Sequence, residues 1–324
     1  MVKAIIINNT GDYDVLKYTD VNVKDPGNCE VLIRHTAIGL NRYDVEHRSG
    51  IRKSKSLPNI LGVEAVGVVE KVGSATEALS VGDRVGYCTA YGGAYSEVRV
   101  INQKYLFKIH DSITDEVAAA VLLKSMTAHY LIHRVYDVRP KTFALVYGLT
   151  GGISQILCQW AAYKGCQVIG AVSSNNHIDI ARRYGCSYVV NYHDDDFVHE
   201  IMDITKGVGA NVVYDPIGLV TYKKAFESLC VFGLYVSYGQ ISGPISNISM
   251  SMLNSRSLFV SSPTIHHYKR SRLELGLSAI EIFEMIKRGY IKVNVNRMYK
   301  FSEVKKAHKD LESRKLTGSN VIVF

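Results

Sequence analysis

Residues 142–160 read TFALVYGLTGGISQILCQW and pass from an apolar run through a glycine-rich turn into an amphipathic segment. Residues 143–146 predict a short strand, and the backbone N–H groups of residues 148–152 are expected to approach a pyrophosphate at the start of a helix. The spacing Gly148-x-x-Gly151-x-x-Ser154 departs from the dinucleotide fingerprint at its last position, where glycine or alanine is usual. An isolated match of this kind also fits an ordinary turn, so the surrounding pattern has to decide.

Strands and helices alternate from residue 143 onward. Strands are predicted at residues 143–146, 167–172, 188–191, 211–214, 234–237 and 258–261, and helices at residues 152–163, 178–184, 197–205 and 222–230. Apolar strands separated by helices are typical of a parallel, doubly wound sheet. This context favours a dinucleotide site at the turn and predicts the fold class α/β.

The first part of the chain reads instead as short strands punctuated by glycines. Strands are predicted at residues 3–8, 29–38, 64–72, 83–87 and 95–101, which suits a compact β-barrel or sandwich. Two helices are predicted next, at residues 116–123 and 125–135. In the tail, helices at residues 279–287 and 303–311 and strands at residues 291–294 and 321–324 are expected to return to the first domain.

Composition limits the function. A chain of 324 residues with 47% hydrophobic and 21% charged residues predicts a globular protein of two domains. No apolar run approaches the roughly 20 residues that span a bilayer, and no signal-peptide pattern is present, so we expect a cytoplasmic protein without a membrane partner. The six cysteines are scattered singly, which predicts neither a disulfide framework nor a thiolate zinc site.

The net charge of +8 raises nucleic acid as a possible partner. The basic residues are dispersed, however, and the densest cluster, at residues 269–272, reads as a solvated turn rather than a groove that follows phosphates. Nucleic acid is therefore not the expected partner.

The end of the second predicted strand bears on the cofactor. Ser173, Ser174 and His177 follow it, where enzymes that use NAD commonly place an acid against the ribose 2′-hydroxyl. Hydroxyls and an imidazole donate to a 2′-phosphate without like-charge repulsion, so NADPH is expected over NADH; the alternative is a polar loop without selectivity. Tyr192, after the third strand, either stacks on the adenosine end or is a surface aromatic.

Several further motifs point to one family. They are GLNRYD (residues 39–44), RSG (48–50), GVEAVGVVEKVG (62–73), GDRV (82–85), GGAYSE (92–97), KSMT (124–127), NY (191–192), YDPIG (214–218), SYG (237–239) and ESR (312–314). Over essentially its whole length the chain resembles the zinc-independent quinone oxidoreductases of the medium-chain dehydrogenase/reductase superfamily, the group that includes zeta-crystallin. The resemblance implies a GroES-like β-barrel catalytic domain at residues 1–123, completed by residues 263–324, and a Rossmann NADPH-binding domain at residues 124–262.

Zinc-dependent relatives carry a cysteine where this chain has Asn41 and a histidine where it has Val63, so we expect no zinc site. Alcohol oxidation is then not favoured, because no Lewis acid stabilises an alkoxide, whereas a quinone is electrophilic enough to accept hydride without a metal. The expected function is NADPH-dependent reduction of a quinone. Two alternatives stay open: reduction of an activated alkene such as an enal or enone, and a weakly catalytic nucleotide- or RNA-binding relative.

The resemblance also implies roles for particular residues. Asn41, Lys124 and Thr127 are implied to contact the nicotinamide and its ribose and to act in catalysis. The other implied cofactor contacts are Gly151, Gly152 and Ile153 at the pyrophosphate, Ser173, Ser174, His177 and Tyr192 at the adenosine end, Gly218, Tyr238, Gly239 and Gln240 toward the nicotinamide, Pro263 and Thr264 at the pocket, and Arg314. The alternatives are structural, because Asn41 could cap a helix, Lys124 could face solvent and Arg314 could form a surface ion pair.

The chain departs from the family at several positions. Glu46 and Arg52 stand where relatives often carry tyrosines near the quinone, and His177 stands where a lysine is common, so the substrate range does not transfer with the fold. The family commonly dimerises through the last strand of the Rossmann sheet, and residues 258–261 are expected to form such an edge in a homodimer. Replacing Ser154 by glycine is expected to leave cofactor affinity equal or improved.

Overall fold

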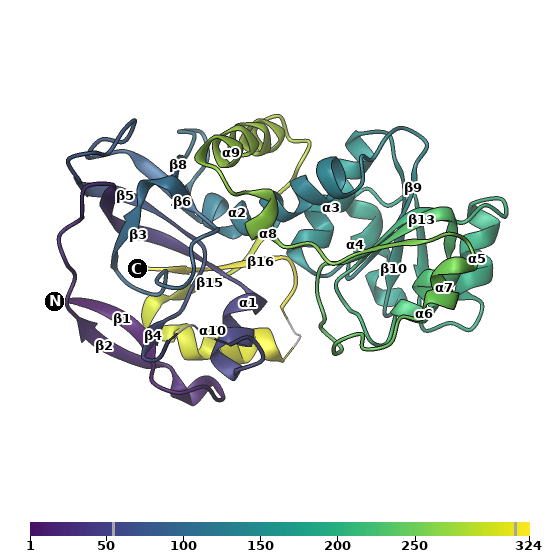
Figure 1. The fold of residues 1–324 in the computed structure, drawn as a ribbon, viewed down its shortest axis with the longest axis horizontal. Helices are drawn as coiled ribbons and strands as arrows, with labels where there is room; N and C mark the ends of the chain where they lie inside the picture. The colour runs from purple at the N-terminus through teal and green to yellow at the C-terminus, as the bar shows by residue number, and fades with distance from the viewer. Residues whose placement is uncertain (54–55, 314–315) are drawn as a thin grey trace. The chain divides into compact units, whose positions relative to one another are not determined.

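The computed structural model describes residues 1–53, 56–313 and 316–324 (Figure 1). These residues form two compact units. The first unit comprises Met1–Met126, Lys269–Arg288 and Val293–Phe324, and the second comprises Thr127–Tyr268 and Gly289–Lys292. Most of the tail therefore belongs to the first unit, and its short segment Gly289–Lys292 belongs to the second.

A six-stranded parallel sheet forms the centre of the second unit. Its strands are β9 (Phe143–Tyr147), β10 (Gln167–Val172), β11 (Tyr188–Asn191), β12 (Ala210–Asp215), β13 (Leu229–Ser237) and β14 (Phe259–Ser261). Their spatial order is β11-β10-β9-β12-β13-β14. Counted along the chain, this is the order 3-2-1-4-5-6 of a doubly wound dinucleotide-binding sheet. The α/β prediction is confirmed.

Helices flank this sheet, which is why its strands are apolar on both faces (Figure 1). Leu145, Ile169 and Val213, on three adjacent strands, are fully buried in one core. The helical elements are η3 (Leu131–Val135), α3 (Gly152–Tyr163), η4 (Asn175–His177), α4 (Ile178–Arg183), α5 (Phe197–Ile204), α6 (Tyr222–Glu227), α7 (Met250–Asn254) and α8 (Ile265–Tyr268).

The first unit contains two sheets. One pairs β2 (Lys17–Val21), β1 (Val2–Ile7) and β4 (Asn59–Ile60) in that order. The other contains β3 (Glu30–Leu40), β5 (Ala65–Val72), β6 (Arg84–Tyr87), β7 (Val98–Asn102), β8 (Phe107–Lys108), β15 (Val295–Lys300) and β16 (Ser319–Val323). The terminal strand β16 pairs antiparallel with β3, so residues from both ends of the chain build one sheet.

Helices of the first unit pack around these sheets. They are η1 (Tyr13–Val15), α1 (Arg42–Ser49), η2 (Gln103–Tyr105), α2 (Asp115–Tyr130), α9 (Arg272–Lys287), η5 (Phe301–Glu303) and α10 (Val304–Glu312). The last residues of α2 belong to the second unit.

The two helices predicted at residues 116–123 and 125–135 are one continuous helix, α2, which continues as the wider turn η3. Lys124, the residue left between the two predictions, lies inside the helix, and the neighbouring Ser125 Oγ donates to the Val121 carbonyl of the preceding turn at 2.6 Å. Helix α6 is shorter than predicted, since Leu229 already pairs with Ala210 in the sheet.

The strand predicted at residues 291–294 was wrong, and the strand of this region is β15, which pairs parallel with β16. The apolar Ile291 is buried, but it lies in a connection rather than in a sheet. Helix α9 begins earlier than predicted, because Ser271 and Glu274 form a capping box at its first turn.

The basic cluster at residues 269–272 is only partly the solvated turn that its sequence predicted, because Arg270 and Ser271 are exposed but Lys269 is not. Lys269 is 5% exposed and its ammonium donates to Ser278 Oγ. Arg272 donates to the Glu77 carbonyl at 2.9 Å. The charged groups of Lys269 and Arg272 therefore both donate hydrogen bonds to other residues of the first unit.

Candidate functional site

A buried polar cluster in the first unit contains two of the implied catalytic residues. Glu64 is fully buried and its carboxylate accepts hydrogen bonds from the Leu123 N–H at 2.6 Å and from Asn41 Nδ2 at 2.7 Å. Lys124 Nζ lies 3.7 Å from Glu64 and donates to Asn41 Oδ1 at 3.1 Å. Because Lys124 is only 7% exposed, it does not face solvent. Glu64 thus fixes the Asn41 amide and balances the Lys124 charge.

Asn41 also begins helix α1, so the capping alternative is compatible with its place in the cluster. Its backbone N–H donates to the Asp44 carboxylate at 3.1 Å, one half of a capping box. Gly39 makes room for this arrangement, because a Cβ at that position would overlap the Glu64 carboxylate and the Ala119 carbonyl. A glycine at position 39 therefore allows Glu64 to approach Asn41 closely enough to form their hydrogen bond.

A cavity of about 520 Å³ lies beside this cluster, entirely within the first unit. Tyr43, His47, Arg52 and Val63 contribute to its wall. The Arg52 guanidinium lies 5.0 Å from the centre of the Tyr43 ring, and its Nε donates to Glu46 at 2.6 Å. Burial, reinforced by the Arg52 charge, lowers the pKa of His47. The wall therefore combines an aromatic face, a cation and a neutral imidazole.

In the second unit, the glycine-rich turn leads directly into helix α3. Gly151 precedes the helix with an extended backbone, and its N–H donates to the Gly148 carbonyl at 2.8 Å. Gly148 has a φ of +72°, and a Cβ there would lie 2.7 Å from Pro216 Cγ. Only glycine fits this position, for both conformational and steric reasons. The turn is thereby held close to the loop that follows β12.

The N-terminus of α3 is open enough to meet an anion. Gly151 is exposed, and Gly152 and Ile153 are half-buried. The first N–H groups of a helix have no acceptor within it and carry the positive end of the helix dipole. The buried Gln155 stiffens the turn, because its Nε2 donates to the Leu149 and Thr150 carbonyls at 3.2 and 3.3 Å.

Ser154, the residue that departs from the fingerprint, has a structural role. It is 2% exposed, its Oγ donates to the Tyr147 carbonyl at 2.8 Å, and the same Oγ lies 2.8 Å from the Tyr238 hydroxyl. Burial raises the pKa of the half-buried Tyr238, so its hydroxyl stays neutral and can share a hydrogen bond with Ser154. The serine links the turn after β9 to the loop after β13, which the sequence did not reveal.

These contacts revise the expectation for position 154. Ser154→Ala is expected to lower the free energy of unfolding by about 1–2 kcal/mol, because the Tyr238 hydroxyl loses its partner. Ser154→Gly is expected to cost about 1 kcal/mol more, since glycine is disfavoured inside a helix. Thermal unfolding of Ser154→Ala, Tyr238→Phe and the double variant measures the coupling. Fully additive effects would contradict the link between the two side chains.

The residues expected at the adenosine end come together after β10. Ser174 caps η4, with its Oγ accepting the Asn176 N–H at 3.3 Å, and Ser173 Oγ lies 3.5 Å from His177 Nδ1. Tyr192 follows the neighbouring strand β11 and is half-buried. Its ring packs 5.6 Å from that of Tyr147, so it is not merely a surface aromatic.

Asp215, at the end of β12, organises the loop that carries Gly218. Its fully buried carboxylate accepts hydrogen bonds from the Ile217 N–H at 2.6 Å, the Gly218 N–H at 3.2 Å, Thr221 Oγ1 at 2.6 Å and the Tyr235 hydroxyl at 2.8 Å. Burial raises the pKa of Asp215, although these four donors oppose the shift. The loop therefore has little freedom to move.

The remaining implied contacts occupy equivalent places after the carboxyl ends of parallel strands, where ligands of such sheets bind. Tyr238, Gly239 and Gln240 follow β13, and Pro263 and Thr264 follow β14. Thr127 is buried near the end of α2. Arg314 lies outside the described residues.

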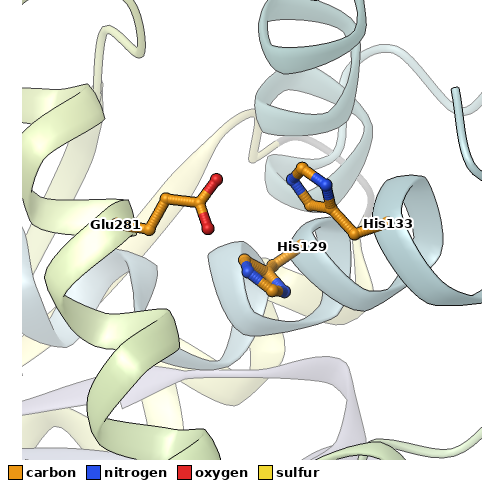
Figure 2. A group of neighbouring side chains, drawn as sticks. All are labelled: His129, His133 and Glu281. Atoms are coloured by element: carbon orange, nitrogen blue, oxygen red, sulfur yellow. The ribbon is translucent and has the colours of Figure 1, made fainter. Parts of the chain in front are cut away.

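Two histidines on consecutive turns of the α2–η3 helix had no expected role. Figure 2 shows His129 and His133 projecting from the same side of this helix. Their ring centres lie 4.7 Å apart, and each ring meets Trp160 edge-on at 5.5 Å. Within the second unit they pack helix α3 against η3. Glu281, also labelled in Figure 2, belongs to α9 of the first unit.

The sequence predicted no role for four residues whose side chains organise the candidate site: Asp44, Glu64, Gln155 and Asp215. All four stand in stretches quoted above; Glu64 directly precedes the apolar strand β5, and Asp215 is the last residue of the apolar strand β12. A charged residue in such a position signals a buried group that needs partners. That signal identifies the residue but not the partners that give it a role.

Comparison with known proteins agrees with this arrangement. Residues 27–111 match the alcohol dehydrogenase GroES-like domain, and residues 152–274 match the model described as zinc-binding dehydrogenase. A quinone oxidoreductase of Pseudomonas aeruginosa is 37% identical over 324 residues, with both chains fully covered. A 2-haloacrylate reductase of Burkholderia sp is 36% identical over 330 residues, covering 100% of this chain and 99% of its own.

Among solved structures, the quinone oxidoreductase of Escherichia coli complexed with NADPH superimposes with a TM-score of 0.95 at 35% identity, covering 99% of this chain and 100% of that chain. The resemblance expected from the motifs is confirmed. The chain belongs to the zinc-independent quinone oxidoreductase family of the medium-chain dehydrogenases/reductases.

Proposed function

We propose that the protein is an NADPH-dependent quinone reductase that works without a metal. The observation that carries this proposal is the Asn41–Glu64–Lys124 cluster. It places a neutral amide, locked by its neighbours, where zinc-dependent relatives have a cysteine ligand. A quinone suits such a site because its reduced form is a comparatively stable aromatic hydroxy compound that needs no Lewis acid.

The second unit fits NADPH. Gly151, Gly152 and Ile153 would hold the pyrophosphate at the start of α3, where the first N–H groups of the helix have no acceptor within it. Ser173, Ser174, His177 and Tyr192 would hold the adenosine end, and Tyr238, Gly239 and Gln240 the nicotinamide side. When bound, NADPH supplies the hydride. We also propose that Asn41, Lys124 and Thr127 orient the nicotinamide. The residues proposed to complete its site are Gly218, Pro263, Thr264 and Arg314.

We propose that the protein has two functional domains. One comprises residues 1–123 and 263–324, and the other comprises residues 124–262.

A second candidate is reduction of an activated alkene, which the similarity to a 2-haloacrylate reductase favours. Following NADPH absorbance with a naphthoquinone and, separately, with an enal distinguishes the candidates. We expect oxidation with the quinone. Oxidation with the enal alone would assign the chain to the second candidate, and binding of NADPH without consumption would favour a nucleotide-binding role.

The cofactor preference is testable at the end of β10. We expect a higher kcat/KM with NADPH than with NADH, because residues 173–177 contain no acid of the kind that bonds the ribose 2′-hydroxyl and would repel a 2′-phosphate. His177→Lys is expected to improve the NADPH value about tenfold, since a charged hydrogen bond contributes about 1.5 kcal/mol. Steady-state kinetics with both cofactors measures this. Equal efficiency with NADH in the natural chain would refute the assignment.

We propose that the protein forms a homodimer through β14. This edge strand presents Phe259 at 59% and Val260 at 39% exposure, an apolar edge that invites pairing with another strand. Light scattering is expected to give the mass of a dimer, and Phe259→Asp is expected to shift it toward the monomer. A monomer before any substitution would contradict the proposal.

We propose a cytoplasmic location. All six cysteines are free, which fits a reducing compartment. None of the helices in the described ranges is long and apolar enough to cross a membrane.

A further inference from the structure

Two cations stand on the wall of the first-unit cavity, Arg52 and Lys53. Neither takes part in the proposed cofactor site. The Arg52 side chain is 52% exposed and Lys53 is exposed as well, so a ligand in the cavity has access to both. The volume of about 520 Å³ lies in the range of cavities that bind small molecules. Both cations are therefore candidates for contact with the substrate.

Glu46 and the Tyr43 ring hold the Arg52 guanidinium at the wall. The Arg52 N–H donates to the Glu46 carbonyl at 3.0 Å, and Arg52 Nε donates to the Glu46 carboxylate at 2.6 Å. The guanidinium lies 5.0 Å from the centre of the Tyr43 ring, which lines the same cavity. A guanidinium has five N–H donors, and among the residues that the structure describes Glu46 is its one hydrogen-bond acceptor. Donors therefore remain for an oxyanion of a ligand.

The other ionisable groups at the wall do not cancel the charge of the two cations. Asp44 also lines the cavity, but it is 1% exposed, and burial raises its pKa to about 7, so near neutral pH it is only partly ionised. Burial also lowers the pKa of His47, which is therefore neutral at this pH. Arg52 and Lys53 against Glu46 and a partly ionised Asp44 leave the wall with a net positive charge.

Aromatic side chains supply another part of the wall. Tyr43 is half-buried and Tyr91 is 51% exposed, and both line the cavity. The ring of a quinone can pack against such side chains without any charged partner. The cations are then left for a different part of the ligand, and the group that a guanidinium binds best is a carboxylate or another oxyanion.

We propose that the cavity selects quinones that carry an anionic substituent, such as a carboxylate or a sulfonate, and that Arg52 binds this group while Lys53 attracts it. The proposal rests on the quinone reductase function, because the ring that bears the substituent is the hydride acceptor. No bond of the substituent changes in the reaction. Arg52 is then a residue that determines specificity through binding, and neutral quinones are the poorer substrates.

The test compares two naphthoquinones that differ in charge. One carries a propionate side chain and the other carries the primary amide of that side chain, so the two rings are almost equally electrophilic. We expect the wild-type kcat/KM to be about fivefold higher for the acid than for the amide. This factor lies between the effect of an exposed ion pair and that of a buried charged hydrogen bond. The difference is expected in KM rather than in kcat.

Three variants assign the effect to Arg52. Arg52→Gln is expected to bring the acid-to-amide ratio of kcat/KM close to one, whereas a loss of folded protein would lower both values equally. Glu46→Gln is expected to raise the ratio, because it removes a competing carboxylate and keeps an oxygen that accepts from Arg52 Nε. Arg34→Gln is the matched control. Arg34 also donates to a carboxylate at 2.6 Å and is 53% exposed, but it lies outside the residues that line the cavity, so the ratio is expected to stay unchanged.

Equilibrium binding separates this proposal from the reductase function. Isothermal titration in the presence of NADP⁺, which has no hydride to donate, gives a Kd for the acid and for the amide without turnover. We expect the acid to bind about fivefold more tightly and Arg52→Gln to remove the difference. A wild type that reduces neither compound would refute the reductase function, and the ratio of the two Kd values would still decide whether the cavity prefers an anion.

Three results would overturn the selection of anionic quinones and leave quinone reduction standing. The first is an active wild type whose acid-to-amide ratio is close to one in both kcat/KM and Kd. The second is a ratio that Arg52→Gln leaves unchanged. The third is a ratio that Arg34→Gln lowers by the same factor as Arg52→Gln, because the preference would then come from the net charge of the protein rather than from the cavity.

Discussion

Glu64→Ala is expected to lower the free energy of unfolding by about 3–5 kcal/mol, the cost of breaking a buried ion pair. The substitution would leave the Lys124 ammonium without its buried counter-charge at 3.7 Å. It would also remove the acceptor of the Leu123 N–H and of the Asn41 amide. Because Asn41 and Lys124 are the proposed nicotinamide contacts, we expect quinone reductase activity to fall together with stability.

Thermal and urea-induced unfolding measure this effect, with Glu70→Ala as the matched control. Glu70 belongs to the same strand region and pairs with Arg34 at 2.6 Å, but both side chains are substantially exposed. An exposed pair contributes about 1 kcal/mol or less. If Glu64→Ala and Glu70→Ala shifted the unfolding midpoint equally, Glu64 would not hold the cluster together.

Asp215→Ala is the second substitution with a large expected effect. It removes the acceptor of four hydrogen bonds at once, two from backbone N–H groups and two from hydroxyls. Each buried donor left without a partner costs about 1–3 kcal/mol, and because the four share one site we expect a total of about 3–5 kcal/mol rather than their sum. The loop that carries Gly218 would loosen, so NADPH is expected to bind more weakly.

Fluorescence titration with NADPH and thermal unfolding test the two halves of this expectation. Asp194→Ala is the control, since Asp194 is an exposed aspartate after the neighbouring strand β11 and accepts one side-chain hydrogen bond, from Asn191 at 3.1 Å. Wild-type NADPH affinity in a destabilised Asp215→Ala variant would show that the loop supports the fold but not the cofactor.

The sheet of the second unit could be predicted closely because its signals are local. The boundaries predicted for β10, β11 and α3 are those of the structure, since glycine turns and continuous apolar strands mark them. Predictions failed where the conformation of a segment depends on residues that lie far from it along the chain. Strand β15 forms because β16 offers it an edge, and Ile291 is apolar because it is buried in a connection.

The candidate site shows the same division. The positions of Gly151, Ser173 and Tyr238 after strand ends follow from the strand pattern, so sequence places them correctly along the sheet. The partners of Asn41 do not follow, because Glu64 and Lys124 are 23 and 83 residues away along the chain. Ser154 was read as a weak substitute for glycine, although its hydroxyl joins two loops that only the folded chain brings together.

The most direct test of the account is a single turnover without oxygen, in which the purified protein, one equivalent of NADPH and a naphthoquinone are mixed and both products are quantified. We predict one hydroquinone for each NADPH oxidised, with the same yield after treatment with a metal chelator. NADPH that stays unoxidised with the quinone but is consumed with an enal would contradict the account.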